Sequence, residues 1–101
     1  MAIQAVLLEP AIADIDEIAQ WYGRSAPEQV RRFFDELEHT LDAIEQYPQS
    51  GPVGTHGLRH RHLRIFPHSV WYSYSETDSS ITILAILHDR RDEAVIKNRI
   101  L

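Results

Sequence analysis

The most informative segment of the chain is Ile81-Thr82-Ile83-Leu84-Ala85-Ile86-Leu87-His88-Asp89-Arg90-Arg91-Asp92. Its first seven residues are almost wholly apolar, which is typical of a strand in the buried middle of a sheet. Five polar residues follow at once and place charge at the rim of that sheet, where binding groups tend to lie. We therefore expect the functional residues near the end of this strand.

The residues before this strand predict the rest of a single α+β domain that spans residues 1–101. A short strand over 3–8 precedes two amphipathic helices, and two strands over 58–66 and 69–75 pair around a turn. Gly23 should end the first helix, and Ser25-Ala26-Pro27-Glu28 has the form of a capping box for the second. The predicted order is strand, antiparallel helix hairpin, three antiparallel strands and a short helix that begins at Asp92.

The composition and charge of the chain limit the classes of function. No cysteine is present, so disulfides and thiolate metal sites are excluded. No apolar run approaches the roughly 20 residues that span a bilayer, and no signal peptide is visible at residues 1–4, so we expect a cytoplasmic chain with no membrane partner. The net charge is −5, with ten acids against three arginines in residues 1–50 and five acids against seven Lys/Arg in residues 51–101. An acidic chain should not coat nucleic acid non-specifically.

Apolar residues occur at both parities of the final strand, and this pattern predicts a partner. One helix hairpin can cover only one face of a single sheet, so the other face should show Trp71, Leu84 and Ile86 to water. An exposed patch of this kind usually marks a protein interface. The alternative is that the C-terminal helix, which contains Val95 and Ile96, covers part of that face itself.

Several segments, in this order, resemble those of a known superfamily of bacterial toxins. They are Ala11-x-x-Asp14-Ile15-x-x-Ile18-x-x-Trp21-Tyr22, Pro27-x-x-Val30-x-x-Phe33, Tyr47-Pro48-x-x-Gly51, Gly57-Leu58-Arg59, Val70-Trp71-Tyr72 and Ile83-Leu84-x-Ile86-Leu87-His88-x-Arg90-Arg91-Asp92. Together they resemble the ParE/RelE superfamily of type II toxin–antitoxin pairs, and the closing segment is most similar to the ParE branch.

The resemblance implies a small antiparallel sheet with the helix hairpin on one face. It implies a cognate antitoxin as the partner in a toxin–antitoxin hetero-oligomer, and contact with DNA only through that antitoxin. ParE toxins inhibit DNA gyrase, RelE toxins cut mRNA in the ribosome, and neither activity requires a cofactor. The same scaffold supports both activities, so the fold cannot choose between them. A non-toxic interaction domain on this scaffold is the third alternative.

Ribonuclease activity would require a base, an acid and cations that converge on the RNA. The candidates for this alternative are Arg61, Arg64 and His88. In a strand, Arg61 shares a face with Arg59, whereas Arg64 falls on the opposite face. No tyrosine follows Tyr74, although the RelE pattern usually places one near the end of the chain. If the chain is instead a ParE-like gyrase inhibitor, we expect no catalytic residues.

The residues that follow the final strand are the other candidates for binding an antitoxin or a target. We assign this role to His88, Arg90 and Arg91, with Trp71, Leu84 and Ile86 on the neighbouring face. The alternatives are that the two arginines pair with nearby acids in solvated salt bridges and that His88 is structural. His60-x-His62 places two imidazoles on one face of a strand, but zinc needs three or four ligands, so we expect no metal site.

Overall fold

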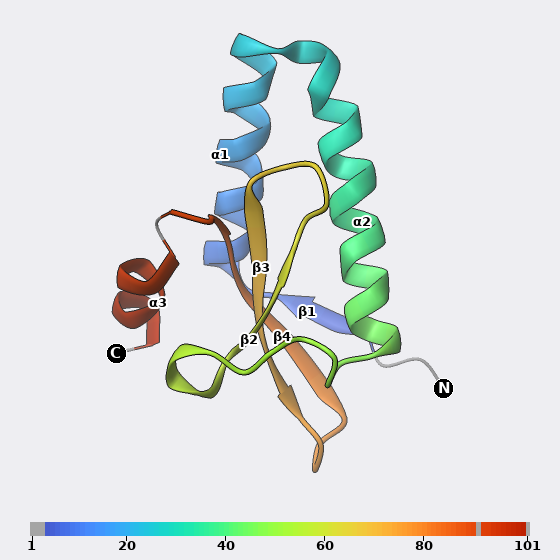
Figure 1. The fold of residues 1–101 in the computed structure, drawn as a ribbon, viewed down its shortest axis with the longest axis vertical. Helices are drawn as coiled ribbons and strands as arrows, with labels where there is room; N and C mark the ends of the chain where they lie inside the picture. The colour runs from blue at the N-terminus through green and yellow to red at the C-terminus, as the bar shows by residue number, and fades with distance from the viewer. Residues whose placement is uncertain (1–3, 91, 101) are drawn as a thin grey trace.

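The computed structural model describes residues 4–90 and 92–100, and the order of its elements confirms the prediction (Figure 1). The strands are β1 (Ala5–Leu7), β2 (Arg59–His62), β3 (His68–Ser75) and β4 (Ser80–His88), and the helices are α1 (Glu9–Ser25), α2 (Val30–Gln46) and α3 (Asp92–Ile100). Two short 3-10 turns, η1 (Pro27–Gln29) and η2 (Thr55–Gly57), complete the described elements. No helix in this part of the chain is long and apolar enough to cross a membrane.

The four strands form one sheet in the order β1-β4-β3-β2. The last strand, β4, lies in its interior as its apolar sequence predicted. Its pairing with β3, and that of β3 with β2, is antiparallel, but β1 pairs with β4 in parallel. The sheet is therefore mixed, and not wholly antiparallel as the resemblance implied, because the two helices that follow β1 carry the chain back before the antiparallel strands begin.

The hairpin of α1 and α2 covers one face of the sheet, as predicted (Figure 1). The two helices diverge, and the loop between β2 and β3 fills the space between them. Its Phe66 ring packs edge-on against Tyr22 of α1 and Phe33 of α2, with centroid distances of 5.3 and 5.6 Å. The main core contains the buried side chains of Ala11, Phe33, Leu37, Ile44, Leu63, Phe66, Val70, Tyr72, Ile81, Ile83 and Ile86.

The predicted capping box between the helices is wrong. Helix α1 continues through Gly23 to Ser25, whose hydroxyl donates a hydrogen bond to the Trp21 carbonyl oxygen at 2.8 Å. Pro27 opens η1 instead of α2, and α2 begins at Val30 without a side-chain cap. The hydroxyl of Ser25 therefore bonds back to its own helix, as Ser commonly does near a helix end.

A β-bulge in β4 reverses the predicted faces of its C-terminal half. Trp71 of β3 pairs with Ala85 and Tyr72 pairs with Ile83, which leaves Leu84 as the extra residue. A bulge sets two residues of one strand against one of its partner, so the alternation of side chains shifts by one position. Ile86 consequently lies on the hairpin face, in the main core, where an unbroken strand would have placed Leu87.

The second face of the sheet is covered by the chain itself, so the prediction that it exposes Trp71 and Ile86 is wrong. Trp71 is only 3% exposed and packs in a second core under α3 and the segment before β2. That core consists of Leu58, Trp71, Ala85, Leu87 and Ile96, with Leu84 and Val95 packed against it. The alternative reading, in which the C-terminal helix shields this face, is confirmed.

Both edges of the sheet are occupied. On the β1 side, the Ala5 N–H donates to a Glu45 carboxylate oxygen at 2.7 Å. On the β2 side, Val53 forms an isolated antiparallel bridge with Arg59, and the His60 N–H donates to the Pro52 carbonyl oxygen at 3.3 Å. A charged side chain and a returning loop are common devices that prevent an added strand from pairing with an edge.

Candidate functional site

The three residues proposed for RNA cleavage do not converge. Arg61 lies on β2 and its guanidinium donates to the Ser50 hydroxyl at 2.7 Å. Arg64 is exposed in the loop after β2. His88 ends β4, and its ring lies against His68 at a centroid distance of 5.4 Å. Since Arg61 and His88 are held by different neighbours on different strands, these three side chains do not form one cluster.

The two faces predicted for β2 are confirmed by its pairing with β3. Arg59 and Arg61 pair with Tyr72 and Val70, which belong to the hairpin face. Arg59 donates to the carbonyl oxygens of Gln49 and Gly51 at 2.9 and 2.7 Å, so it fixes the loop after α2. His60 faces the other way and stacks on Trp71 at 4.7 Å. Within residues 4–90 and 92–100, no three His, Asp or Glu side chains are placed to hold a metal ion.

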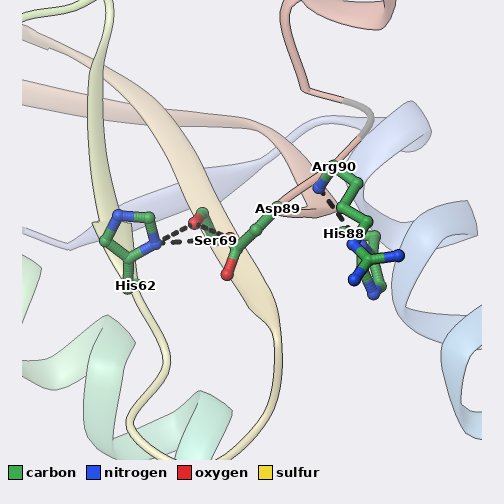
Figure 2. A network of polar contacts seen from close by, with 5 residues as sticks. All are labelled: His62, Ser69, His88, Asp89 and Arg90. Atoms are coloured by element: carbon green, nitrogen blue, oxygen red, sulfur yellow. Dashed lines mark hydrogen bonds and ion pairs between the residues drawn. The ribbon is translucent and has the colours of Figure 1, made fainter.

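A small polar cluster links the ends of β2, β3 and β4 on the second face (Figure 2). The buried Ser69 hydroxyl donates to an Asp89 carboxylate oxygen at 2.5 Å and lies 2.6 Å from His62 Nδ1. His62 Nδ1 is also 3.3 Å from the same carboxylate oxygen. Ser69 is fully buried and its proton is directed at Asp89, so it is not an activated nucleophile. The cluster positions the turn that leads from β4 into α3.

On the opposite side of this turn, His88 and Arg90 point toward α1 (Figure 2). His88 Nδ1 accepts a hydrogen bond from the Arg90 backbone N–H at 3.2 Å. Its neighbour His68 is 7% exposed and lies among the rings of Tyr22 and Phe33. The His68 Nδ1 atom is buried without a hydrogen-bond partner. Burial, and then repulsion from His88, lower the pKa of His68, although Asp89 acts in the other direction.

The lowered pKa of His68 makes the fold sensitive to acid. The unfolded chain binds more protons than the native state at pH values below the ordinary histidine pKa of about 6.5. The free energy of unfolding should therefore decrease as the pH falls below this value. Above it, His68 is neutral in both states and does not lower the stability. Urea titrations between about pH 7.5 and 5.5 should show a smaller decrease for His68→Phe than for the wild type.

The matched control for this prediction is His39→Gln, because His39 is exposed on α2. Its pH dependence should equal that of the wild type. If His68→Phe retained the full acid sensitivity, the burial of a neutral His68 would not be its source.

One ion pair joins α1, β4 and α3. Arg99 donates from both terminal nitrogens to the two Asp14 carboxylate oxygens, each at 2.7 Å. The Asp14 carboxylate also accepts the Ile86 backbone N–H at 2.9 Å, and Arg99 reaches the Leu84 carbonyl oxygen at 3.3 Å. The hydrogen bonds that Arg99 donates to Asp14 raise the pKa of Arg99 further, so the guanidinium stays charged. The ion pair thus connects the carbonyl group of the bulge residue Leu84 and strand β4 with helices α1 and α3.

Above this ion pair lies a groove of about 620 Å³, which we call the α1–α3 groove. Helix α1 forms one wall, α3 forms the other, and the end of β4 forms the floor. Its lining includes Trp21 and Arg24 of α1, the buried His68, and His88 and Arg90 at the end of β4. The groove combines an exposed aromatic ring, two imidazoles, three arginines and two carboxylates, and this mixture of apolar and charged side chains is a surface suited to binding.

The residues predicted to bind a partner have separate positions. His88 and Arg90 line the α1–α3 groove, and Leu84 is half-buried beside α3. Trp71 is buried, Ile86 is buried but also lines this groove, and Arg91 lies outside the described residues. Asp89, the acid nearest in sequence to Arg90, contacts His62 and Ser69 instead.

Four further residues of this region were not predicted from the sequence, namely Asp14, Trp21, Arg24 and Arg99. Asp14 and Arg99 are 85 positions apart, and nothing local distinguishes them from other charged residues on helices. The sequence did contain a signal for Trp21. Tyr22 belongs to the apolar stripe of the first helix, so the adjacent Trp21 must point away from the core and toward the surface.

Comparisons with known proteins agree with this architecture. A mixed four-stranded sheet with a helix hairpin on one face is the scaffold of RelE-like toxins. The family model described as "ParE toxin of type II toxin-antitoxin system, parDE" matches residues 6–93. The chain therefore belongs to the ParE toxin family of type II toxin–antitoxin systems.

Two solved structures share the fold. A chain of the chromosomal ParDE TA system from P. aeruginosa is 22% identical, with a TM-score of 0.74, over 86% of this chain and 96% of that one. A chain of the archaeal RelE-RelB complex from Pyrococcus horikoshii OT3 is 21% identical, with a TM-score of 0.54, over 90% of this chain and 99% of that one. No curated protein matches the sequence.

Proposed function

We propose that this chain is the active toxin of its pair, that a cognate antitoxin neutralises it, and that DNA gyrase is its target. The observation that carries the proposal is the ParE family match, which extends through the segment after β4. The dispersal of Arg61, Arg64 and His88 supports gyrase poisoning over RNA cleavage. The two structural neighbours are toxin–antitoxin complexes, which supports a hetero-oligomer with an antitoxin that alone contacts DNA. The proposed compartment is the cytoplasm.

Two assays test the target. Induction of the chain without its antitoxin should arrest growth, and the purified chain should inhibit supercoiling by DNA gyrase or accumulate cleaved DNA. If the chain instead cut mRNA during translation and left supercoiling intact, its target would be the ribosome and not gyrase. Normal growth at a verified level of expression would support a non-toxic interaction domain.

The two arginines that follow β4 in the sequence should contribute to toxicity or antitoxin binding. Arg90→Glu with Arg91→Glu is expected to weaken at least one of the two by about tenfold or more, since a hydrogen bond to a charged group contributes about 1.5–3 kcal/mol. The double variant should keep the wild-type thermal unfolding curve, because both residues follow the last strand. The matched control is Arg31→Glu with Arg32→Glu, an equal charge change on exposed positions of α2. Wild-type toxicity and antitoxin affinity in the first double variant would remove these arginines from the site.

A further inference from the structure

The α1–α3 groove has two ends that differ in charge. At the end near the start of α1, Arg99 is neutralised by Asp14 and is also influenced by the charge of Glu17. At the other end, Arg24 and Arg90 are exposed, and no carboxylate lies within ion-pair distance of either in the part of the chain that the structure describes. Positive charge without a compensating partner is therefore concentrated at one end of the groove.

Beside these arginines lies an apolar surface that the fold leaves partly exposed. The Trp21 ring is 56% exposed on α1 and contacts Tyr22 only edge-on, at a centroid distance of 5.0 Å. Ile18, one turn earlier, and Val95 of α3 line the same groove and are half-buried. The floor contains His68, which is more than nine-tenths buried and whose Nδ1 atom lacks a hydrogen-bond partner. An exposed indole next to uncompensated arginines is typical of the centre of a protein interface.

The surrounding charge selects among anionic ligands. Helix α1 carries Glu9, Asp14, Asp16 and Glu17 against Arg24 as its only basic residue. The phosphates of a nucleic acid laid along α1 would be repelled by these acids. A single carboxylate bound at the arginine end of the groove would lie away from them. Addition of a strand to the sheet is also disfavoured, because Glu45 and the segment 52–54 occupy its edges. The ligand must therefore bind through its side chains.

We propose that the α1–α3 groove binds an antitoxin segment that carries a carboxylate next to a bulky apolar side chain. The carboxylate pairs with Arg24 and Arg90, and the apolar side chain packs on Trp21 between the two helices. Arg24 is then a specificity residue for the partner, because its guanidinium can hold a carboxylate with two parallel hydrogen bonds. This inference rests on the proposed function, since it names the part of the antitoxin that the toxin recognises.

The two tryptophans of the chain provide a direct measurement. Trp71 is buried and its indole nitrogen has no hydrogen-bond partner, so Trp71→Phe breaks no hydrogen bond and leaves Trp21 as the only indole. Overlapping peptides that tile the cognate antitoxin are titrated into this variant. A peptide that occupies the groove should shift the Trp21 emission to shorter wavelength, and that peptide should contain an acidic residue beside a large apolar one.

Charge reversal then tests the proposed pairing. Arg24→Glu should weaken the peptide at least tenfold, and Arg24→Gln should weaken it less. Replacement of the acidic residue of the peptide by Lys should restore affinity for Arg24→Glu but not for the wild type. The matched control is Arg31→Glu, which should change the dissociation constant less than twofold. Circular dichroism of each variant verifies that the fold is unchanged.

The outcomes separate this inference from the proposed function. Tight binding of the intact antitoxin with no effect of Arg24→Glu would overturn the groove assignment and leave the proposed function standing. Failure of both the intact antitoxin and its peptides to bind would overturn both. A single-stranded RNA hexamer that shifts the Trp21 emission with the same dependence on Arg24, while no peptide does so, would show that the groove recognises nucleic acid.

Discussion

Asp14→Ala should lower the free energy of unfolding by about 3 kcal/mol, the largest effect we expect from removal of a single charge in this chain. The substitution leaves Arg99 with a charge that is 24% exposed and has lost its partner. It also leaves the Ile86 backbone N–H, deep in the sheet, without its acceptor. Loss of one member of a buried pair is costly because the remaining charge stays desolvated. Urea unfolding at neutral pH, followed by circular dichroism, measures the change.

Asp16→Ala is the matched control for Asp14→Ala. Asp16 lies on the same helix but is exposed, and its carboxylate accepts a hydrogen bond only from the Gln20 side chain at 3.0 Å. A surface change of this kind should alter stability by about 0.5 kcal/mol or less. Addition of Arg99→Leu to Asp14→Ala should restore part of the loss, because the double variant no longer buries an unpaired charge. Equal effects of Asp14→Ala and Asp16→Ala would show that the ion pair contributes nothing in solution.

The Asp14–Arg99 pair illustrates which part of the structure the sequence could predict. Apolar periodicity placed both helices, three of the four strands and α3 close to their observed positions, because each depends on neighbours a few residues apart. The ion pair depends on two residues that come together only after the sheet and α3 have formed. No pattern within either helix distinguishes Asp14 from Asp16, or Arg99 from Lys97.

The faces of β4 show a second limit of the same kind. The strand is apolar at both parities, so a single inserted residue leaves no trace in its pattern of hydrophobicity. The bulge at Leu84 exchanged the positions expected for Ile86 and Leu87, and the second face was covered by α3. The family match and the two structural neighbours support the antitoxin partner that the resemblance to ParE implied, but the physical reason given for a partner, an exposed second face, was wrong. The surface that the fold leaves open is the α1–α3 groove.

Ile86→Ala tests the bulge directly. Ile86 is 1% exposed in the main core, and its truncation should lower the free energy of unfolding by about 3 kcal/mol, through lost burial and the cavity that remains. Leu84, the extra residue, is half-buried. Leu84→Ala should lower the free energy of unfolding by about 1 kcal/mol, because the truncation removes less buried apolar surface and leaves a smaller cavity. An unbroken strand would set both side chains on one face and would make the two costs similar.

The comparison of Ile86→Ala with Leu84→Ala also separates stability from partner binding. Leu84 does not line the α1–α3 groove, so Leu84→Ala should bind the antitoxin with nearly wild-type affinity under conditions in which it remains folded, whereas Ile86 is part of the groove lining. Urea unfolding gives the two stabilities, and calorimetric titration with the antitoxin gives the affinities. If Leu84→Ala were the more destabilising change, the register of β3 and β4 would be continuous. The face toward α3 would then carry Ile86, as the unbroken alternation predicts.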